Sequence, residues 1–310
     1  MKKIIILNKP KGCRLANQLW NYISIYAYSL EIGARCVNFC FYENKKDQIT
    51  GVRSYDNYYK YFNIPNHKII SLIVNLNTII NRLSQKLRPL NRYVKYIKNK
   101  NKIICSGEEM AFYLEPTKNN SIINNKTTKI YFDGWMFRNP KGIEKYRREI
   151  IKYFAPKEKF IKKIESKINK LKSKYNHIVG VHIRKGDYKV FLGGKLYFDD
   201  REINKILQEY LKEFNKDKDK TCFLACSDEK INMDKFPGLN IIKNNGNMIE
   251  DLFILAKTDI IIGSDSTFGA FASYYGDVPF VVFQKPKMDW EYYKDKKYYF
   301  ENKHNTLTFY

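Results

Sequence analysis

Short apolar runs in the second half of the chain alternate with longer stretches in which apolar residues recur every three or four positions. The runs have the length of buried strands, and the spacing between them is that of helices with one apolar face. We expect strands over residues 178–183, 222–226, 239–243, 259–262 and 279–283, and helices over about 201–214, 248–257 and 267–275. Regular alternation of this kind predicts a parallel sheet covered by helices on both faces.

The first half of the chain begins with the same order of elements. A short buried strand is expected over residues 4–7, and a loop with Pro10 and Gly12 follows it. A helix should begin near Asn17, and another strand is expected over residues 37–42. Strand, glycine-containing loop, helix and strand form the start of an α/β unit.

A Lys/Glu-rich helical stretch over residues 140–175 separates the two halves, after a further expected strand over residues 129–137. We therefore expect an N-terminal α/β domain over residues 1–170 and a C-terminal α/β domain over residues 171–310.

Residues 66–104 show a different, basic and amphipathic pattern. Its apolar stripe at helical spacing consists of Leu72, Ile73, Leu76, Ile79, Ile80, Leu83 and Leu87. Between Asp56 and Glu108 the chain has ten Lys or Arg residues and no acid. The simpler interpretation is a helix that covers a core and has a solvated basic face. The alternative is a surface that rests on anionic lipid.

Composition and charge narrow the classes of protein that the chain can represent. Of its 310 residues, 44% are apolar and 28% are charged, which is typical of a globular protein. The formal net charge of +24 attracts polyanions, whether nucleic acid, anionic lipid or phosphorylated small molecules. No run of about 18 apolar residues could span a bilayer, and the first apolar run is too short for a signal peptide. We therefore expect a cytoplasmic protein, with peripheral contact to the inner face of a membrane as an option.

One strand of the second half ends in a group of polar residues that a buried strand does not need. The stretch IVGVHIRKGDY runs from apolar residues into His182, Arg184, Gly186 and Asp187. Ligands of an open parallel sheet bind beyond the carboxyl ends of its strands. An arginine there offers a permanent, forked cation to phosphate oxygens, and the glycine lets the backbone approach a ligand. The alternative is a structural Arg–Asp pair that ends the strand.

A second stretch, DIIIGSDSTFGAFASYYGDVP, also leads from a strand into small polar residues. Gly263, Ser264, Ser266 and Thr267 lie at the start of the expected helix. Hydroxyl residues at this place are ordinary N-caps, but a helix N-terminus also binds anions through its amide groups and its dipole. Two such features at neighbouring strand ends predict a diphosphate held between them.

Together with the N-terminal stretch GCRLANQLWNY, these stretches resemble the α-1,2-fucosyltransferases of glycosyltransferase family 11. The α-1,6- and protein O-fucosyltransferases are similar at a greater distance. The resemblance spans residues 12–280 and is weak over residues 45–128. It implies a GT-B-like fold of two Rossmann-like α/β domains, with the acceptor on the N-terminal side and GDP-fucose on the C-terminal domain. It also implies inversion at the anomeric carbon, no metal requirement, and an oligosaccharide or lipid-linked glycan as acceptor.

The resemblance assigns roles to individual residues. Arg184 matches the family arginine that binds the donor β-phosphate, His182 matches its neighbour in the nucleotide pocket, and Asp187 matches an acid beside the fucose. These three are the catalytic candidates, although Asp187 is the nearest base by motif only and can instead orient Arg184. The donor-binding candidates are Asn17, Gln18, Asp228, Asp251, Ser266, Thr267 and Phe268.

Two of these assignments have structural alternatives. Asp251 matches an aspartate that reads guanine in the α-1,6 relatives, and a carboxylate suits the two adjacent N–H donors of that base. It can equally be a helix-start acid that the helix dipole favours. Asn17 and Gln18 can hydrogen-bond a diphosphate or sugar, but Asn17 would also serve as the N-cap of its own helix. Ala16 stands where the family usually has glycine, so the loop before them differs.

Neither a metal nor another cofactor is expected. Metal-dependent sugar transferases commonly hold a cation with a DxD pair. Here the pair Asp217 and Asp219 lies in the stretch KDKDK, which is typical of a solvated loop. The six cysteines form no CxxC pair and the four histidines are scattered, so a zinc site is not expected. Cys222 and Cys226 should be reduced core residues.

Three alternatives remain open from the sequence. A related transferase could use another GDP-sugar, such as a mannosyl or rhamnosyl donor. The net charge permits a nucleic-acid-binding protein, but the chain lacks an interleaved aromatic and basic recognition element, so no specific nucleic-acid partner is expected. The basic and amphipathic pattern of residues 66–104 is also compatible with a protein that acts as a peripheral membrane scaffold and has no catalytic activity.

Overall fold

The computed structural model describes residues 2–8, 14–38, 40–46, 53–64, 94–99, 111–114, 127–295 and 302–306. These residues form two compact units, the first within Met1–Ala155 and the second within Pro156–Thr308. The division falls earlier than residue 170, because helix α5 (Glu158–Lys172) packs on elements of the second unit. The apolar stripe expected between residues 72 and 87 lies outside the described residues.

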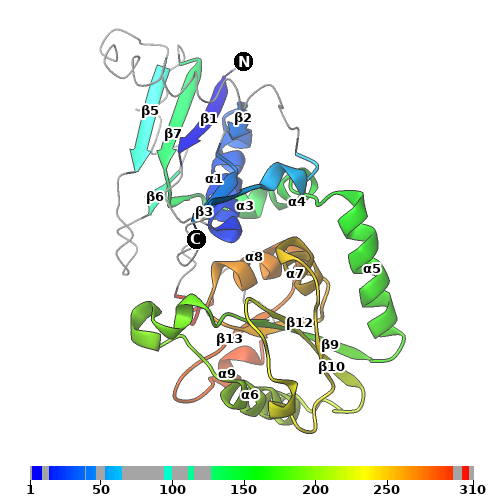
Figure 1. Ribbon diagram of the computed structural model, residues 1–310. Coiled ribbons are helices and arrows are strands. Elements are labelled where there is room, and N and C mark those ends of the chain that lie inside the picture. Colours follow the sequence, from blue (N-terminus) through cyan, green and yellow to red (C-terminus); the bar gives the residue numbers. More distant parts are fainter. Residues whose placement is uncertain are drawn as a thin grey trace. The chain divides into compact units, whose positions relative to one another are not determined.

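Four of the described strands of the first unit form a parallel sheet with the order β2-β1-β7-β5 (Figure 1). The strands of this sheet are β1 (Lys3–Asn8), β2 (Arg35–Asn38), β5 (Val94–Asn99) and β7 (Lys129–Gly134). The smaller elements are the antiparallel pair β3 (Tyr42–Lys46) and β4 (Arg53–Asn57), the parallel pair β6 (Phe112–Tyr113) and β8 (Phe137–Arg138), and the helices α3 (Pro140–Lys145) and α4 (Arg147–Tyr153). The strand expected over residues 129–137 is divided between β7 and β8, where Met136 has a φ of 62°.

Helix α1 (Leu15–Glu31) connects β1 to β2 and is almost entirely buried. Leu19, Trp20 and Ile23 have no exposed surface, and the helix packs against α3 and β8. The N-cap position is occupied by Arg14. The interpretation of Asn17 as the N-cap is therefore wrong, because this residue already lies inside the first turn.

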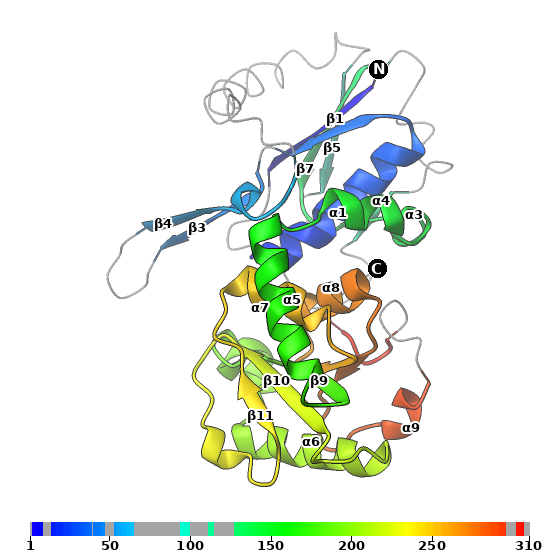
Figure 2. The same cartoon turned by 90° about the vertical axis from the view of Figure 1, so that its right-hand side faces the viewer.

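The described strands of the second unit form a parallel sheet with the order β11-β10-β9-β12-β13, and Figure 2 shows β11, β10 and β9 of this sheet. The strands are β9 (His177–Ile183), β10 (Thr221–Ser227), β11 (Ile241–Lys243), β12 (Ile260–Gly263) and β13 (Phe280–Val282), and the remaining helices are α6 (Asp200–Glu213), α7 (Met248–Leu255), α8 (Thr267–Gly276) and α9 (Trp290–Tyr293). Helix α5 packs against α7, and α7 packs against α8, whereas α6 and α9 cover the other face (Figure 1). The predicted parallel sheet with helices on both faces is confirmed.

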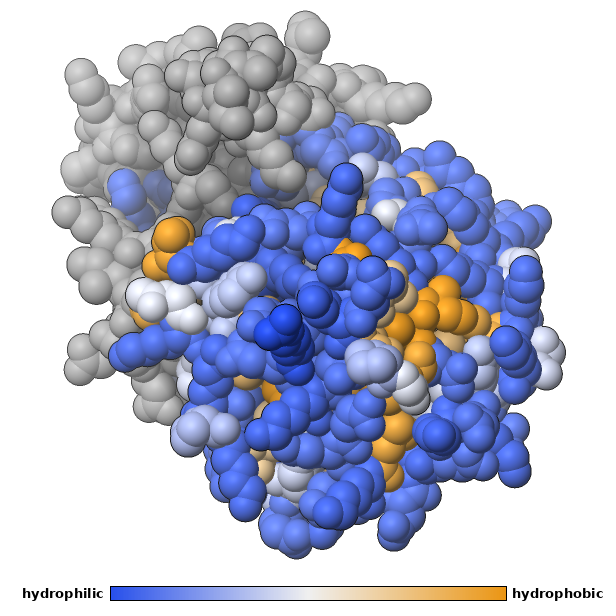
Figure 3. Space-filling view, turned by 60° about the horizontal axis from the view of Figure 1, so that its bottom comes forward, coloured by the Kyte–Doolittle hydropathy of each residue, from blue (hydrophilic) through white to orange (hydrophobic). Residues whose placement is uncertain are grey.

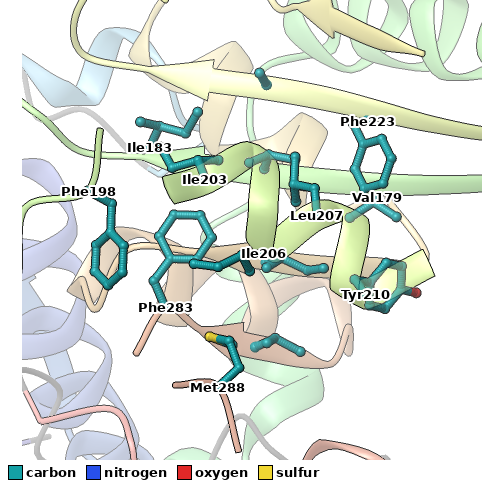
Figure 4. Close-up of a cluster of buried hydrophobic side chains, with 14 of the residues drawn as sticks. Val179, Ile183, Phe198, Ile203, Ile206, Leu207, Tyr210, Phe223, Phe283 and Met288 are labelled. Atoms are coloured by element: carbon teal, nitrogen blue, oxygen red, sulfur yellow. The ribbon is translucent and has the colours of Figure 1, made fainter. Parts of the chain in front are cut away.

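The pleat of β9 determines which of its side chains reach each face of the sheet. Val179 and Ile183 point toward α6 (Figure 4), and both belong with Val181 to a buried hydrophobic cluster. Successive side chains of a strand point to opposite faces. His182 therefore lies on the face that α7 and α8 cover.

The surface shown in Figure 3 is mainly hydrophilic, with smaller hydrophobic areas, as expected for a chain in which 28% of the residues are charged. Among the described helices, none is both long and apolar enough to cross a bilayer. Cys36, Cys40, Cys222 and Cys226 are buried and do not form disulfides, so the expectation of reduced core residues at 222 and 226 is confirmed.

Candidate active site

The strand order of the second sheet reverses at β9. β10 and β11 extend the sheet on one side of β9, and β12 and β13 extend it on the other. Ligands of open α/β sheets bind at such a switch point, beyond the carboxyl ends of the strands. Residues 184–187 follow β9, and residues 264–268 follow β12, whose Gly263 pairs with His182. The structure thus brings together the two stretches that the sequence singled out.

Arg184 lies just beyond the end of β9 and forms a bidentate pair with Asp187. Its Nε and Nη2 atoms donate to the two carboxylate oxygens at 2.8 and 2.6 Å. Its guanidinium lies 4.8 Å from the ring centre of Tyr188, and its backbone N–H donates to the Ser264 hydroxyl at 2.9 Å. The side chain is 21% exposed, and its other N–H groups make no hydrogen bond to any described residue. The arginine is therefore held in place and still has donors for a phosphate.

The loop after β12 is ordered by two serine hydroxyls. Ser264 accepts the Arg184 N–H, and Ser266 is the N-cap of α8, where its hydroxyl accepts the N–H of Phe268 at 3.2 Å. Thr267 is the first residue of this ten-residue helix. The N-cap interpretation of Ser266 is thus confirmed. The helix N-terminus nevertheless lies at the carboxyl edge of the sheet, where its dipole favours an anion.

His182, near the end of β9, lies beside the first turn of α8. Its ring stacks on Phe268 with the ring centres 5.1 Å apart. Burial, together with the charge of Arg184, lowers the pKa of His182 to about 3. Its Nε2 atom is buried and has no hydrogen-bonding partner among the described residues. The imidazole is therefore neutral at pH 7, and it is too weak a base to accept a proton efficiently.

Asp228 follows β10 and holds the Arg184 loop through its backbone. Its Oδ1 atom accepts the N–H of Lys185 at 2.8 Å and that of Gly186 at 3.5 Å. A Cβ added to Gly186 would lie 3.1 Å from the other carboxylate oxygen. This position favours a role in orienting the loop over direct contact with a nucleotide base.

Lys185 is a supporting residue that the sequence analysis did not identify. It is 5% exposed, and its Nζ donates to Asp200 Oδ1 at 2.5 Å. The second oxygen of Asp200 accepts the N–H of Asn232 at 3.2 Å. A buried ammonium group requires such a partner. In a chain rich in lysine, only the place of Lys185 next to Arg184 could have indicated its role.

Asp251 lies in the first turn of α7, at the carboxyl edge of the same sheet. Its Oδ1 accepts from the Asn244 amide at 2.5 Å, and the Asn244 oxygen accepts from the Lys167 ammonium. Burial raises the pKa of Asp251 to about 6. The helix start is satisfied by a capping box of Asn247 and Glu250. Asp251 is therefore not the cap of α7, although as an acid of the first turn it still lies where the helix dipole favours a negative charge.

Asn17 and Gln18 belong to α1 in the first unit. Gln18 is 6% exposed, and its Nε2 donates to the backbone oxygen of Tyr42 at 2.9 Å. The site described above lies within the second unit and does not include these two residues. Donor contacts by Asn17 and Gln18 stay a prediction.

Asp217 and Asp219 lie in the loop before β10, at the amino edge of the sheet. Asp217 accepts the N–H of Asp219 at 2.9 Å and pairs with Lys220 at 3.9 Å. The DxD pair therefore belongs to a turn at the edge opposite to Arg184. In the part of the chain that the structure describes, no group of three or more His, Cys, Asp or Glu side chains could hold a metal ion.

Solved structures that are similar to this chain establish its fold. POFUT1 in complex with GDP-fucose superposes with a TM-score of 0.56 at 11% identity, over 91% of this chain and 98% of that one. The fucosyltransferase NodZ from Bradyrhizobium gives a TM-score of 0.51 at 16% identity, over 93% and 97%. A mutant of FUT1 of Arabidopsis thaliana in complex with GDP gives a TM-score of 0.54 at 11% identity, over 92% and 71%. At these identities the similarity establishes the fold, which is the GT-B-like α/β fold expected from the sequence.

The family follows from the sequence match. The model of glycosyl transferase family 11 matches residues 69–302, which contain the whole candidate site. The chain therefore belongs to glycosyl transferase family 11. Among curated proteins, none matches the chain.

Proposed function

We propose that this protein transfers L-fucose from GDP-fucose to a hydroxyl group of a glycan, with inversion at the anomeric carbon and formation of an α-1,2 linkage. The observation that carries the proposal is Arg184, which Asp187 holds at the switch point of the sheet beside the N-terminus of α8. Fucose is favoured over another sugar because the sequence around Arg184 resembles that of fucosyltransferases. The similar fold of POFUT1 in complex with GDP-fucose supports the same donor.

In the proposed reaction the acceptor oxygen forms a bond to C1 of fucose while the bond between C1 and the β-phosphate oxygen breaks. Negative charge then grows on the departing GDP. Arg184 and the N-terminus of α8 would stabilise this charge. Tyr188 and Ser264 contact Arg184, and contacts that fix a charged group in advance limit its reorganisation during the reaction.

The acceptor hydroxyl must also lose its proton to a base. Asp187 is the candidate that the motif offers, but both of its oxygens accept hydrogen bonds from Arg184. An opposite charge at this distance makes a carboxylate a poorer base. We therefore assign to Asp187 the orientation of Arg184 as its first role.

We propose that Asp251 reads the guanine base. Guanine presents N1–H and N2–H₂ side by side, and a carboxylate accepts both. Asn244 holds one oxygen of Asp251 at 2.5 Å and so orients the carboxylate. Burial removes part of the hydration of the Asp251 carboxylate and raises its pKa to about 6. A partner with two N–H donors would compensate for this loss.

We also propose that transfer does not require a metal ion. The DxD pair that would hold a cation lies in a turn at the other edge of the sheet, and Arg184 supplies a permanent positive charge at the site itself. The cytoplasmic location and the contact of residues 66–104 with anionic lipid stay predictions. Cosedimentation with vesicles that contain or lack anionic lipid tests the latter.

The proposed function is tested with GDP-fucose and GDP-mannose as donors on an oligosaccharide array. Release of GDP from GDP-fucose that depends on the acceptor, with an α-1,2 linkage in the product by NMR, is the expected result. Faster transfer from GDP-mannose would favour the alternative donor instead. A fucosylated product with another linkage would correct the linkage and leave the donor assignment standing.

A further inference from the structure

A buried carboxylate lies inside the loop that we assign to the donor diphosphate. Asp265 stands between Ser264 and Ser266 and is 3% exposed. A negative charge in an anion-binding loop would repel the donor if it pointed at the phosphates. A buried carboxylate must also receive hydrogen bonds from the protein.

The Asp265 side chain turns toward a distant part of the chain. Its Oδ2 accepts the backbone N–H of Thr306 at 2.9 Å and the Thr306 hydroxyl at 2.5 Å. Thr306 belongs to residues 302–306, which are also held at a second place. There the carboxylate of Asp289 pairs with Lys303 at 2.9 Å and with His304 at 3.1 Å.

The backbone of Asp265 connects this contact to the catalytic arginine. Its carbonyl oxygen accepts the hydroxyl of Tyr188 at 2.5 Å. The ring of Tyr188 lies 4.8 Å from the Arg184 guanidinium, and the Ser264 hydroxyl next to Asp265 accepts the Arg184 N–H. Thr306 and Arg184 are thus joined by one continuous set of contacts within the second unit.

We propose that Thr306 and Asp265 form a clasp that positions Arg184 and the start of α8 for the donor diphosphate. The clasp holds the loop of residues 264–266 through the Asp265 side chain. The Asp265 carboxylate is thereby turned toward Thr306 and away from the place that we assign to the diphosphate. Tyr188 and Ser264 then transmit the position of this loop to Arg184. Asp265 and Thr306 are positioning residues, because their side chains bind each other and do not face the place that we assign to the diphosphate. The functional part of this inference rests on the proposed transfer reaction, whereas the clasp itself does not.

The clasp is tested first without any ligand, by amide hydrogen exchange of the full chain. Thr306→Val removes the hydroxyl donor and keeps the shape of the side chain, and Thr306→Ser keeps the hydroxyl. We expect the amides of Arg184 and Phe268 to exchange about tenfold faster in Thr306→Val, the scale that loss of a hydrogen bond to a charged group gives to local opening. Thr306→Ser should exchange like the wild type.

Asp289→Asn is the matched control, because it weakens the other attachment of residues 302–306 and does not touch the loop. Unchanged exchange in Thr306→Val would overturn the clasp, and so would equal acceleration in Asp289→Asn. With GDP-fucose as donor, Thr306→Val should lower kcat and leave the acceptor KM unchanged, and Thr306→Ser should restore kcat. If the wild type transfers no fucose, the proposed function fails, and the exchange data still decide on the clasp.

Discussion

Replacement of Arg184 by lysine tests the centre of the proposed mechanism. Arg184 donates two parallel hydrogen bonds to Asp187, and its remaining N–H groups are the donors that we assign to the β-phosphate. Lysine keeps the charge but cannot reproduce the planar fork. Loss of one preorganised donor to a charged transition state costs about 2.7–4 kcal/mol, or roughly 100- to 1000-fold in kcat. We expect a loss of that size in Arg184→Lys.

The same change should affect stability only slightly. The side chains of Arg184 and Asp187 are 21% and 41% exposed, and ion pairs of this exposure contribute about 0.2–1 kcal/mol. For a unit of this size, such a loss lowers Tm by at most about 4 °C. Initial rates of GDP release and thermal unfolding by circular dichroism measure the two effects separately. Arg201→Lys, at an exposed position in α6, is the matched control and should be neutral. Near-normal turnover in folded Arg184→Lys would refute the role of the guanidinium.

Three further changes test other parts of the site. Asp251→Asn should weaken GDP binding in calorimetry by about 5- to 150-fold, the equivalent of 1–3 kcal/mol for badly matched polar partners, with no loss of Tm; a lower Tm with unchanged affinity would contradict the guanine assignment. Because the pKa of Asp251 is raised to about 6, wild-type GDP affinity should fall as the pH drops below 6, and this fall should be smaller in Asp251→Asn, in which only the terminal phosphate of GDP, with a second pKa of about 6, still takes up a proton in this range. Transfer should persist in excess EDTA, and Asp217→Ala with Asp219→Ala should leave the rate unchanged; activity that disappears in EDTA and returns with Mn²⁺ would disprove metal independence. Lys185→Met should lower the free energy of unfolding by about 3–5 kcal/mol in denaturant titration, because it leaves the carboxylate of Asp200, which is only 13% exposed, without its cation, and a smaller loss would show that water solvates Asp200.

Much of the second unit could be predicted because each of its elements carries a local signal. The predicted strand over residues 178–183 is β9, and the predicted helix over 267–275 is α8, each within one residue at its ends. Where polar residues bound an apolar run, the length of the run predicts the length of the strand or helix. The strand expected over residues 37–42 is instead divided between β2 and β3, because an apolar run alone does not show where pairing to one neighbour ends and pairing to another begins.

By itself, the sequence determined the class of fold, the family, and the place of Arg184 and Ser266 beyond strand ends, because periodicity and short motifs are properties of neighbouring residues. Only the tertiary structure decided which charges meet. The ammonium group of Lys185 pairs with Asp200, and the carboxylate of Asp265 accepts a hydrogen bond from Thr306, which lies 41 positions further along the chain. The physical reason is that the stability of a buried charge depends on what folding places around it. Groups that are close in space are often distant in sequence, and a local sequence pattern does not predict such contacts.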